Sequence, residues 1–181
     1  AIFTEDVGTV TFTVTTDQAV AGGFSVNLGY GGTAESSDYN GAETSLVFSD
    51  GDLSKSFTVT GVSDTRVEGN ETIVVSLLSV TPVVPPAGAF ILGGPATSTI
   101  TDDDSGATLT LTRNNATFAE DGGTVTFTVT TDRAVEGGFT VNLGYGGTAE
   151  SSDYSGAVTT LVFSDTDLSK SFTVTGESDT R

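Results

Sequence analysis

The sequence predicts an all-β protein made of two tandem antiparallel β-sandwiches, of which the second is truncated. Three features indicate this: a long internal repeat, apolar residues that alternate with threonine, and turn-forming Gly, Asn, Asp and Ser between the alternating runs. Residues 1–66 return as residues 116–181, an offset of about 115, with roughly five in six positions unchanged. The function should therefore belong to the repeated module or to the junction between its copies.

Each copy of the repeat lacks a segment that the other copy has. Only the first copy continues through residues 67–104, and only the second is preceded by a strand-like run at residues 107–113. We therefore predict a first domain at residues 1–104 that lacks most of its first strand. A second domain is predicted at residues 105–181, without its last two strands. The natural protein is expected to continue in both directions.

Strands are predicted where apolar residues occupy every second position, which gives one buried and one solvent-exposed face. This alternation begins at residues 9–15, and shorter strands are expected at residues 46–48 and 96–101. The apolar positions of the longer runs are Val10, Phe12 and Val14; Phe24, Val26, Leu28 and Tyr30; Phe57 and Val59; and Ile73, Val75 and Leu77. The sequence has no helical period with caps, so we predict seven-stranded, immunoglobulin-like sandwiches with Greek-key connections. A threonine-rich solenoid is disfavoured, because a period of about 115 residues is too long for its coils.

The composition excludes several classes of function. Six basic against 24 acidic residues, a net charge of −18, disfavour nucleic acid or an anionic membrane as partner and favour cations. The chain contains neither Cys nor His, so thiol chemistry, disulfides and the usual general base are missing. It also has no long apolar run that would insert into a membrane. The sequence therefore predicts a binding or structural module and not an enzyme.

Acidic residues gather at one end of the predicted sandwich, which we call the far end. If each strand reverses direction, the far end receives the loops at residues 31–41 and 61–70, the segment before residue 9 and the segment after residue 101. The opposite, near end carries only the scattered acids Asp17, Asp50 and Asp52. Crowded carboxylates repel one another, and oxygen ligands without His or Cys suit a hard cation, Ca²⁺ more than Mg²⁺. Acidic turns that merely keep a β protein soluble are the alternative.

Several motifs resemble those of the Calx-β domain family, which is found in sodium–calcium exchangers and in extracellular repeat proteins. They span nearly the whole chain and are AED at residues 119–121, GTAESSDYNG at 32–41, LVFSDGD at 46–52, SDTRVEGNETIVVSL at 63–77 and TITDDD at 99–104. The resemblance implies a seven-stranded sandwich that binds several Ca²⁺ ions at one end. It also implies the ligand residues, which in the first copy are Glu5, Asp38, Asp64, Glu68, Glu71, Asp102, Asp103 and Asp104.

The second copy retains fewer of these acidic positions, namely Glu120, Asp153 and Asp179, so it is expected to bind calcium poorly. Ser63 also departs from the family pattern, because calcium-rich members carry another Asp there. One ion of the first copy is therefore expected to be weaker or missing.

Three functions remain open from the sequence. The leading one is a calcium-binding structural repeat of a large secreted or cell-surface protein, in which Ca²⁺ stiffens the module end and the inter-repeat junction. A regulatory Ca²⁺ sensor of a membrane transporter, which would be cytosolic, is the second. A carbohydrate-binding or adhesion module is the third, although the chain has no Trp for a sugar platform. Neighbouring repeats of the same chain are the expected partners in the leading case.

The incomplete sandwiches should leave strand edges exposed, and exposed edges invite pairing with another chain. The sequence therefore admits a homodimer that completes its sandwiches by strand exchange. An arbitrary boundary or proteolysis would explain the same incompleteness.

Overall fold

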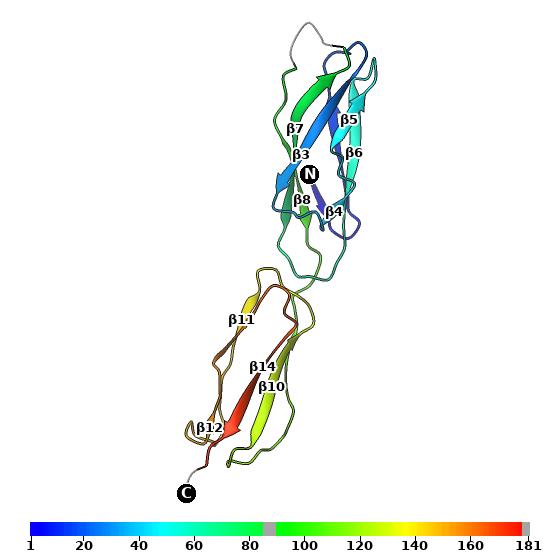
Figure 1. The fold of residues 1–181 in the computed structure, drawn as a ribbon. Coiled ribbons are helices and arrows are strands. Elements are labelled where there is room, and N and C mark those ends of the chain that lie inside the picture. The colour runs from blue at the N-terminus through cyan, green and yellow to red at the C-terminus, as the bar shows by residue number, and fades with distance from the viewer. Residues whose placement is uncertain (85–89, 179–181) are drawn as a thin grey trace. The chain divides into compact units, whose positions relative to one another are not determined.

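A computed structural model describes residues 1–84 and 90–178, and every regular element within them is a β-strand (Figure 1). The chain folds as two compact units, the first made of Ala1–Asp64 with Gly69–Asp103 and the second of Thr65–Glu68 with Asp104–Arg181. Among the described residues, no helix is long and apolar enough to cross a membrane. The predicted all-β fold class is confirmed, whereas the predicted domain limits, 1–104 and 105–181, stay a prediction.

The first unit contains a five-stranded sheet. Its strands, in spatial order, are β1 (Ile2–Thr4), β8 (Ala96–Thr101), β7 (Glu71–Pro82), β3 (Phe24–Gly32) and β5 (Ser45–Phe48). The strands β3 and β7 run side by side over most of their length, as Figure 1 shows, with one register shift between Asn27 and Leu28. All pairs are antiparallel except β1 with β8, which are parallel.

A three-stranded sheet covers the other side of the first unit and consists of β2 (Thr9–Thr15), β6 (Ser54–Gly61) and β4 (Tyr39–Asn40). Its outer face is polar, because Thr and Ser occupy the alternate positions of β2 and β6. Cross-strand pairs of hydroxyls stabilise this face, including Thr13 with Ser56, whose side-chain oxygens are 2.8 Å apart. The alternation predicted from the sequence is therefore present.

Apolar side chains from both sheets fill the space between them. Phe24 stacks on Phe48 with ring centroids 4.4 Å apart, and Tyr30 meets Phe57 of the opposite sheet edge to face at 6.5 Å. Val59 and Ile73 have no exposed surface. Burial of these residues supplies the main favourable free energy of the sandwich.

The register of the strands brings several strand ends together at the far end of the first unit. Thr4 pairs with Thr101, Gly32 pairs with Ile73, and Tyr39 pairs with Gly61. The loops that follow or precede these residues therefore leave the two sheets at the same end.

The second unit repeats this architecture with fewer strands. One sheet contains β12 (Tyr154–Ser155), β14 (Ser169–Gly176), β10 (Thr124–Thr131) and β9 (Leu109–Arg113), and the other contains β11 (Phe139–Asn142) and β13 (Thr160–Phe163). In Figure 1, β10 and β14 lie side by side, and their hydroxyl pairs match those of the first unit. The predicted opening strand at residues 107–113 is present as β9.

The short strand β1 differs from the sequence prediction, which left the first copy without most of its first strand and placed no strand at residues 2–4. The strand forms because residues 2–4 find a partner in β8. The equivalent residues 117–119 form no strand, and no described strand pairs with them. Pairing with β8 therefore stabilises the extended conformation of residues 2–4.

Candidate metal centre

Glu5 directly follows β1 and is the most deeply placed of the predicted ligands. Its backbone N–H donates to the carbonyl of Thr101 over 3.2 Å, which ties it to the end of β8. Only 5% of Glu5 is exposed, although it carries a carboxylate. Burial disfavours the charged form of a carboxylate unless other groups stabilise it.

Gly61, at the end of β6, allows the backbone before Glu5 to approach closely. A side-chain Cβ at position 61 would lie 2.6 Å from the Thr4 carbonyl oxygen and 2.7 Å from the Glu5 Cα. No residue with a side chain fits this space without a shift of the backbone. Gly61 therefore helps to hold Glu5 at the far end.

Asp64 brings a second carboxylate to Glu5. It lies on the loop after β6 and is exposed, and its carboxylate oxygen comes within 4.8 Å of a Glu5 carboxylate oxygen. Two like charges at this separation, one of them buried, repel each other. A cation between the two carboxylates would remove that repulsion.

Asp38 and Glu71 form a second pair, with carboxylate oxygens also within 4.8 Å of each other. Asp38 is oriented by its own loop, because one carboxylate oxygen accepts the Glu35 N–H at 2.5 Å and the other accepts the Ser37 hydroxyl at 3.0 Å. Glu71 is the first residue of β7 and is partly exposed. A loop and the start of a strand therefore hold two carboxylates close together.

Glu68 and Asp104 belong to the second unit, and both are partly buried. Glu68 forms an ion pair with Arg66 over 3.2 Å, and Asp104 forms one with Arg133. Each residue lies directly beside the first unit along the chain, since Glu68 precedes Gly69 and Asp104 follows Asp103.

Of the ligands predicted in the first copy, Asp102 and Asp103 do not join a cluster. Within residues 1–84 and 90–178, neither is part of a group of three carboxylates whose oxygens lie within 4.8 Å of one another. Asp102 is partly buried and Asp103 is exposed.

The second copy carries a weaker arrangement. Glu120, the counterpart of Glu5, is exposed. Asp153 repeats the local geometry of Asp38 and accepts the Glu150 N–H at 2.8 Å. Neither residue joins a group of three close carboxylates in the part of the chain that the structure describes. The third predicted ligand, Asp179, lies outside the described residues.

Sequence reasoning missed two kinds of residue around the site. Gly61 gave no signal of its own, although its counterpart Gly176 occupies the same close contact beside Glu120. The ion pairs of Arg66 and Arg133 also went unpredicted, because their carboxylate partners are distant in the sequence or shared among many acids. The only available signal was that arginine is rare in this chain, where Lys and Arg together number six.

The donor set limits the chemistry of this end. The clustered groups are carboxylates, and the chain has no His or Cys. Carboxylate oxygens bind hard cations, and they provide no nucleophile with an adjacent base of the usual kind. The arrangement can therefore hold a divalent cation and order the loops that carry its ligands.

Comparison with known proteins identifies the family. The sequence model of the Calx-beta domain matches residues 2–104 and, a second time, residues 102–180. No curated protein matches the chain.

Three solved structures resemble the chain at low identity. The calcium binding domain CBD12 of CALX1.1 is 22% identical, with 97% of this chain and 72% of that chain covered and a TM-score of 0.46. CBD12 from CALX1.2 is 23% identical over the same shares, with a TM-score of 0.45. The apo-form Calx CBD1 domain is 23% identical, covers 57% of this chain and 89% of its own, and has a TM-score of 0.45. The family match covers nearly every residue, and the chain belongs to the Calx-beta domain family.

Proposed function

We propose that this chain is a calcium-binding structural module, and not an enzyme, whose principal metal site lies at the far end of the first unit. The observation that carries the proposal is the buried carboxylate of Glu5 with Asp64 beside it. Membership of the Calx-beta family supports calcium as the ligand. A divalent cation would convert the repulsion between these carboxylates into a favourable interaction.

Calcium suits the geometry better than magnesium. Ca²⁺ accepts six to eight oxygen ligands at flexible angles, whereas Mg²⁺ requires a strict octahedron and releases its water reluctantly. The carboxylates come from the segment after β1, from two loops and from the start of β7, so small loop movements can adjust them. Ligands of this kind favour the larger ion.

We propose further ligand roles for Glu68, Asp102, Asp103 and Asp104, which the resemblance to the Calx-beta family implies. Glu68 and Asp104 each form an ion pair with an arginine, and a cation bound to either carboxylate would compete with that ion pair. Asp102 and Asp103 are assigned a weaker role, because neither belongs to a group of three close carboxylates within the described residues.

The second copy is proposed to bind calcium poorly. Glu120 is exposed where Glu5 is buried, and an exposed carboxylate gains less from a bound ion because water already solvates it. Glu120→Gln should therefore leave the calcium affinity of the chain unchanged, whereas Glu5→Gln should lower it.

The biological setting that we favour is a repeat of a secreted or cell-surface protein, in which calcium stiffens the module end and the junction between repeats. Near-identical neighbouring modules, the absence of Cys and the net charge of −18 support this setting. The second candidate is a regulatory sensor of a transporter, since the Calx-beta family includes exchanger domains. Affinity separates the two, because extracellular modules bind near about 10⁻⁴–10⁻³ M and sensors near about 10⁻⁷–10⁻⁵ M.

Calorimetric titration of chelator-stripped protein with Ca²⁺ tests the proposal. We expect saturable binding that Glu5→Gln and Asp64→Asn each weaken at least tenfold, while Mg²⁺ binds much more weakly. Asp17→Asn is the matched control, because Asp17 is an exposed acid at the near end and its loss removes the same charge. Equal effects of Asp17→Asn and Asp64→Asn would mean that calcium responds only to overall charge.

A further inference from the structure

Residues Thr65–Glu68 fold as part of the second unit, and a backbone bridge holds them there. Val67 forms a parallel bridge with Val135: the Val67 N–H donates to the Ala134 carbonyl at 3.0 Å, and the Glu136 N–H donates to the Val67 carbonyl, also at 3.0 Å. Both bonds use backbone atoms only. The loop before β11 therefore presents a short extended edge that accepts an extra segment.

An ion pair adds specificity to this bridge. The guanidinium of Arg66 donates to Asp165, and the same carboxylate oxygen accepts the Gly137 N–H at 3.1 Å. Burial lowers the pKa of Arg66, but the surrounding carboxylates, Asp165 foremost, outweigh it and raise the pKa above its ordinary value. The surface therefore selects a segment in which an arginine precedes a residue with extended backbone.

The first unit contains the same receiving surface. Residues 18–23 are the repeat counterpart of residues 133–138, and Asp50 is the counterpart of Asp165. The backbone conformation also agrees: Gly22 and Gly23 have φ of 77° and 78°, while Gly137 and Gly138 have 71° and 69°. The turn bond recurs as well, from Gly23 N–H to Val20 at 2.9 Å and from Gly138 N–H to Val135 at 3.0 Å.

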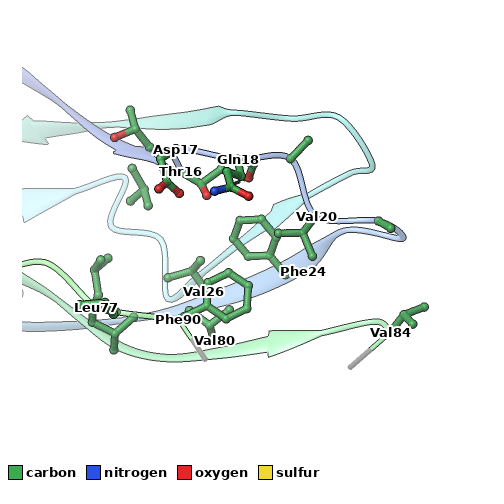
Figure 2. A pocket seen from close by; sticks show the side chains of 16 residues that line it. Thr16, Asp17, Gln18, Val20, Phe24, Val26, Leu77, Val80, Val84 and Phe90 are labelled. Carbon is green, nitrogen blue, oxygen red and sulfur yellow. Dashed lines mark hydrogen bonds between the residues drawn. The ribbon is translucent and has the colours of Figure 1, made fainter. Parts of the chain in front are cut away.

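In the first unit this surface borders a cavity of about 890 Å³. The cavity is lined by Gln18 to Ala21 and by apolar residues that include Phe24, Val80 and Phe90. Figure 2 shows Gln18 and Val20 together with these apolar side chains. A β-branched side chain that entered beside Val20 would bury apolar surface there. The cavity is therefore suited to a valine at the bridge position.

We propose that the surface formed by Ala19–Ala21 and Asp50 binds a second copy of the Thr-Arg-Val-Glu segment, contributed by another module of this kind. The segment adds a one-residue parallel bridge at Val20, its arginine pairs with Asp50, and its valine faces the cavity. This is backbone pairing at an exposed edge, with one charged contact that selects the sequence. The proposal does not rest on the proposed calcium site, although Glu68 of the segment is one of the residues proposed to bind calcium.

Two substitutions between the copies set the strength of this contact. Gln18 replaces Arg133, so the ion pair with an acidic residue equivalent to Asp104 is lost. Ala21 replaces Glu136, whose carboxylate contributes to the field at Arg66. The backbone bonds do not depend on either side chain. The surface of the first unit should therefore bind the segment more weakly than the second unit does, and Ala21→Glu should strengthen it.

Disulfide capture tests the proposal, because the chain has no cysteine of its own. Val20→Cys is introduced into the full chain, which is equilibrated under a thiol–disulfide buffer containing EDTA with a peptide of residues 61–70 that carries Val67→Cys. A scrambled peptide of the same composition corrects for the intrinsic reactivity of the thiol. Val47→Cys is the matched control, since Val47 is an exposed residue, 65% accessible, on β5 and outside the surface.

We expect Val20→Cys to capture the native peptide at least tenfold more than the scrambled one, and Val47→Cys to show no preference. Asp50→Asn, added to Val20→Cys, should remove most of the preference, and Ala21→Glu should increase it. Equal capture of both peptides at Val20, or indifference to Asp50, would overturn the proposal. Amide shifts of residues 19–21 in the unmodified chain on addition of the unmodified peptide provide the second readout, and their absence at millimolar peptide would also contradict it.

Discussion

Val7 adopts a left-handed backbone conformation, with φ of 53°, in the turn that follows Glu5. Among the described residues it is the only one other than glycine with positive φ. This conformation costs a β-branched residue about 1–2 kcal/mol. The second copy has Gly122 at the same position, with φ of 73°. The first copy therefore stores strain beside its buried carboxylate.

Replacement of Val7 by glycine tests this strain. Val7→Gly should raise the free energy of unfolding by up to about 1 kcal/mol, because the relief of strain exceeds the larger chain entropy of glycine in the unfolded state. The matched change Gly122→Val should lower it by about 1–2 kcal/mol. Urea denaturation measures both. A loss of stability in Val7→Gly would show that the valine side chain contributes more than its backbone costs.

A methyl group at Gly61 should disturb Glu5. Gly61→Ala would push the backbone at Thr4 and Glu5, and overpacking of this kind typically costs about 1–3 kcal/mol. We expect a lower melting temperature and weaker calcium binding together. Gly31→Ala is the control, because nothing lies within 4 Å of its Cβ position. Unchanged calcium affinity in Gly61→Ala would show that Gly61 does not help to position Glu5 for calcium.

Two aspartates in loops between strands make the stability of the fold sensitive to acid. Asp52 lies in the loop between β5 and β6, where its carboxylate accepts the Ser49 N–H at 2.7 Å and meets the Lys55 ammonium at 2.8 Å. The contact with Lys55, followed by that with Ser49, lowers the pKa of Asp52 below its ordinary value. Asp167 repeats the arrangement with Lys170 and Ser164, and its pKa is lowered for the same reasons.

The sign of the pH effect follows from these lowered pKa values. The stabilisation is fully present above the unfolded-state pKa of an aspartate, about 3.9, and is lost as the pH falls through the lower folded-state pKa. The melting temperature should therefore fall less steeply between pH 6 and pH 2 in the double variant Asp52→Asn, Asp167→Asn than in the parent chain. An equally steep fall would mean that other carboxylates cause the acid sensitivity. The near-end control Asp17→Asn should retain the parent slope.

Much of the fold at the level of elements could be predicted from the sequence. The alternation of Val10, Phe12 and Val14 indicates the buried face of a strand, so β2 was predicted at its observed position. The short strand β1 was not predicted, because its extension depends on parallel pairing with β8, about a hundred residues away in the chain. The assignment of residues 65–68 to the second unit could not be predicted from the sequence either. It depends on backbone hydrogen bonds at Val67, which the pattern of side chains does not indicate.

The site was predictable in part for the same reason. Strand parity indicated that Glu5, Asp38, Asp64 and Glu71 leave the sheets at one end, and the register of the strand ends agrees. Parity carries no information on depth, so the burial of Glu5 and the exposure of Glu120 could not be anticipated. Which acids of a dense acidic chain meet is decided by loop conformation. The roles of the individual ligands therefore stay predictions.

The net charge of −18 opposes compaction of the whole molecule. Bound calcium should reduce this repulsion mainly at the far end of the first unit. A ligand that binds only the folded state adds about 2.7 kcal/mol at a hundredfold excess over its dissociation constant. Calcium should therefore raise the melting temperature of the first unit. The second unit, whose Glu120 is exposed, should respond much less.

The most direct test of a calcium site at the far end is the melting temperature of Glu5→Gln and the parent chain, each measured in chelator and in saturating Ca²⁺. Without calcium, Glu5→Gln should melt at the same temperature as the parent or higher, because a buried charge beside Asp64 has been removed. With calcium, Glu5→Gln should melt at a lower temperature, because a ligand is missing. An equal loss of stability in both conditions would mean that Glu5 stabilises the fold and does not bind calcium.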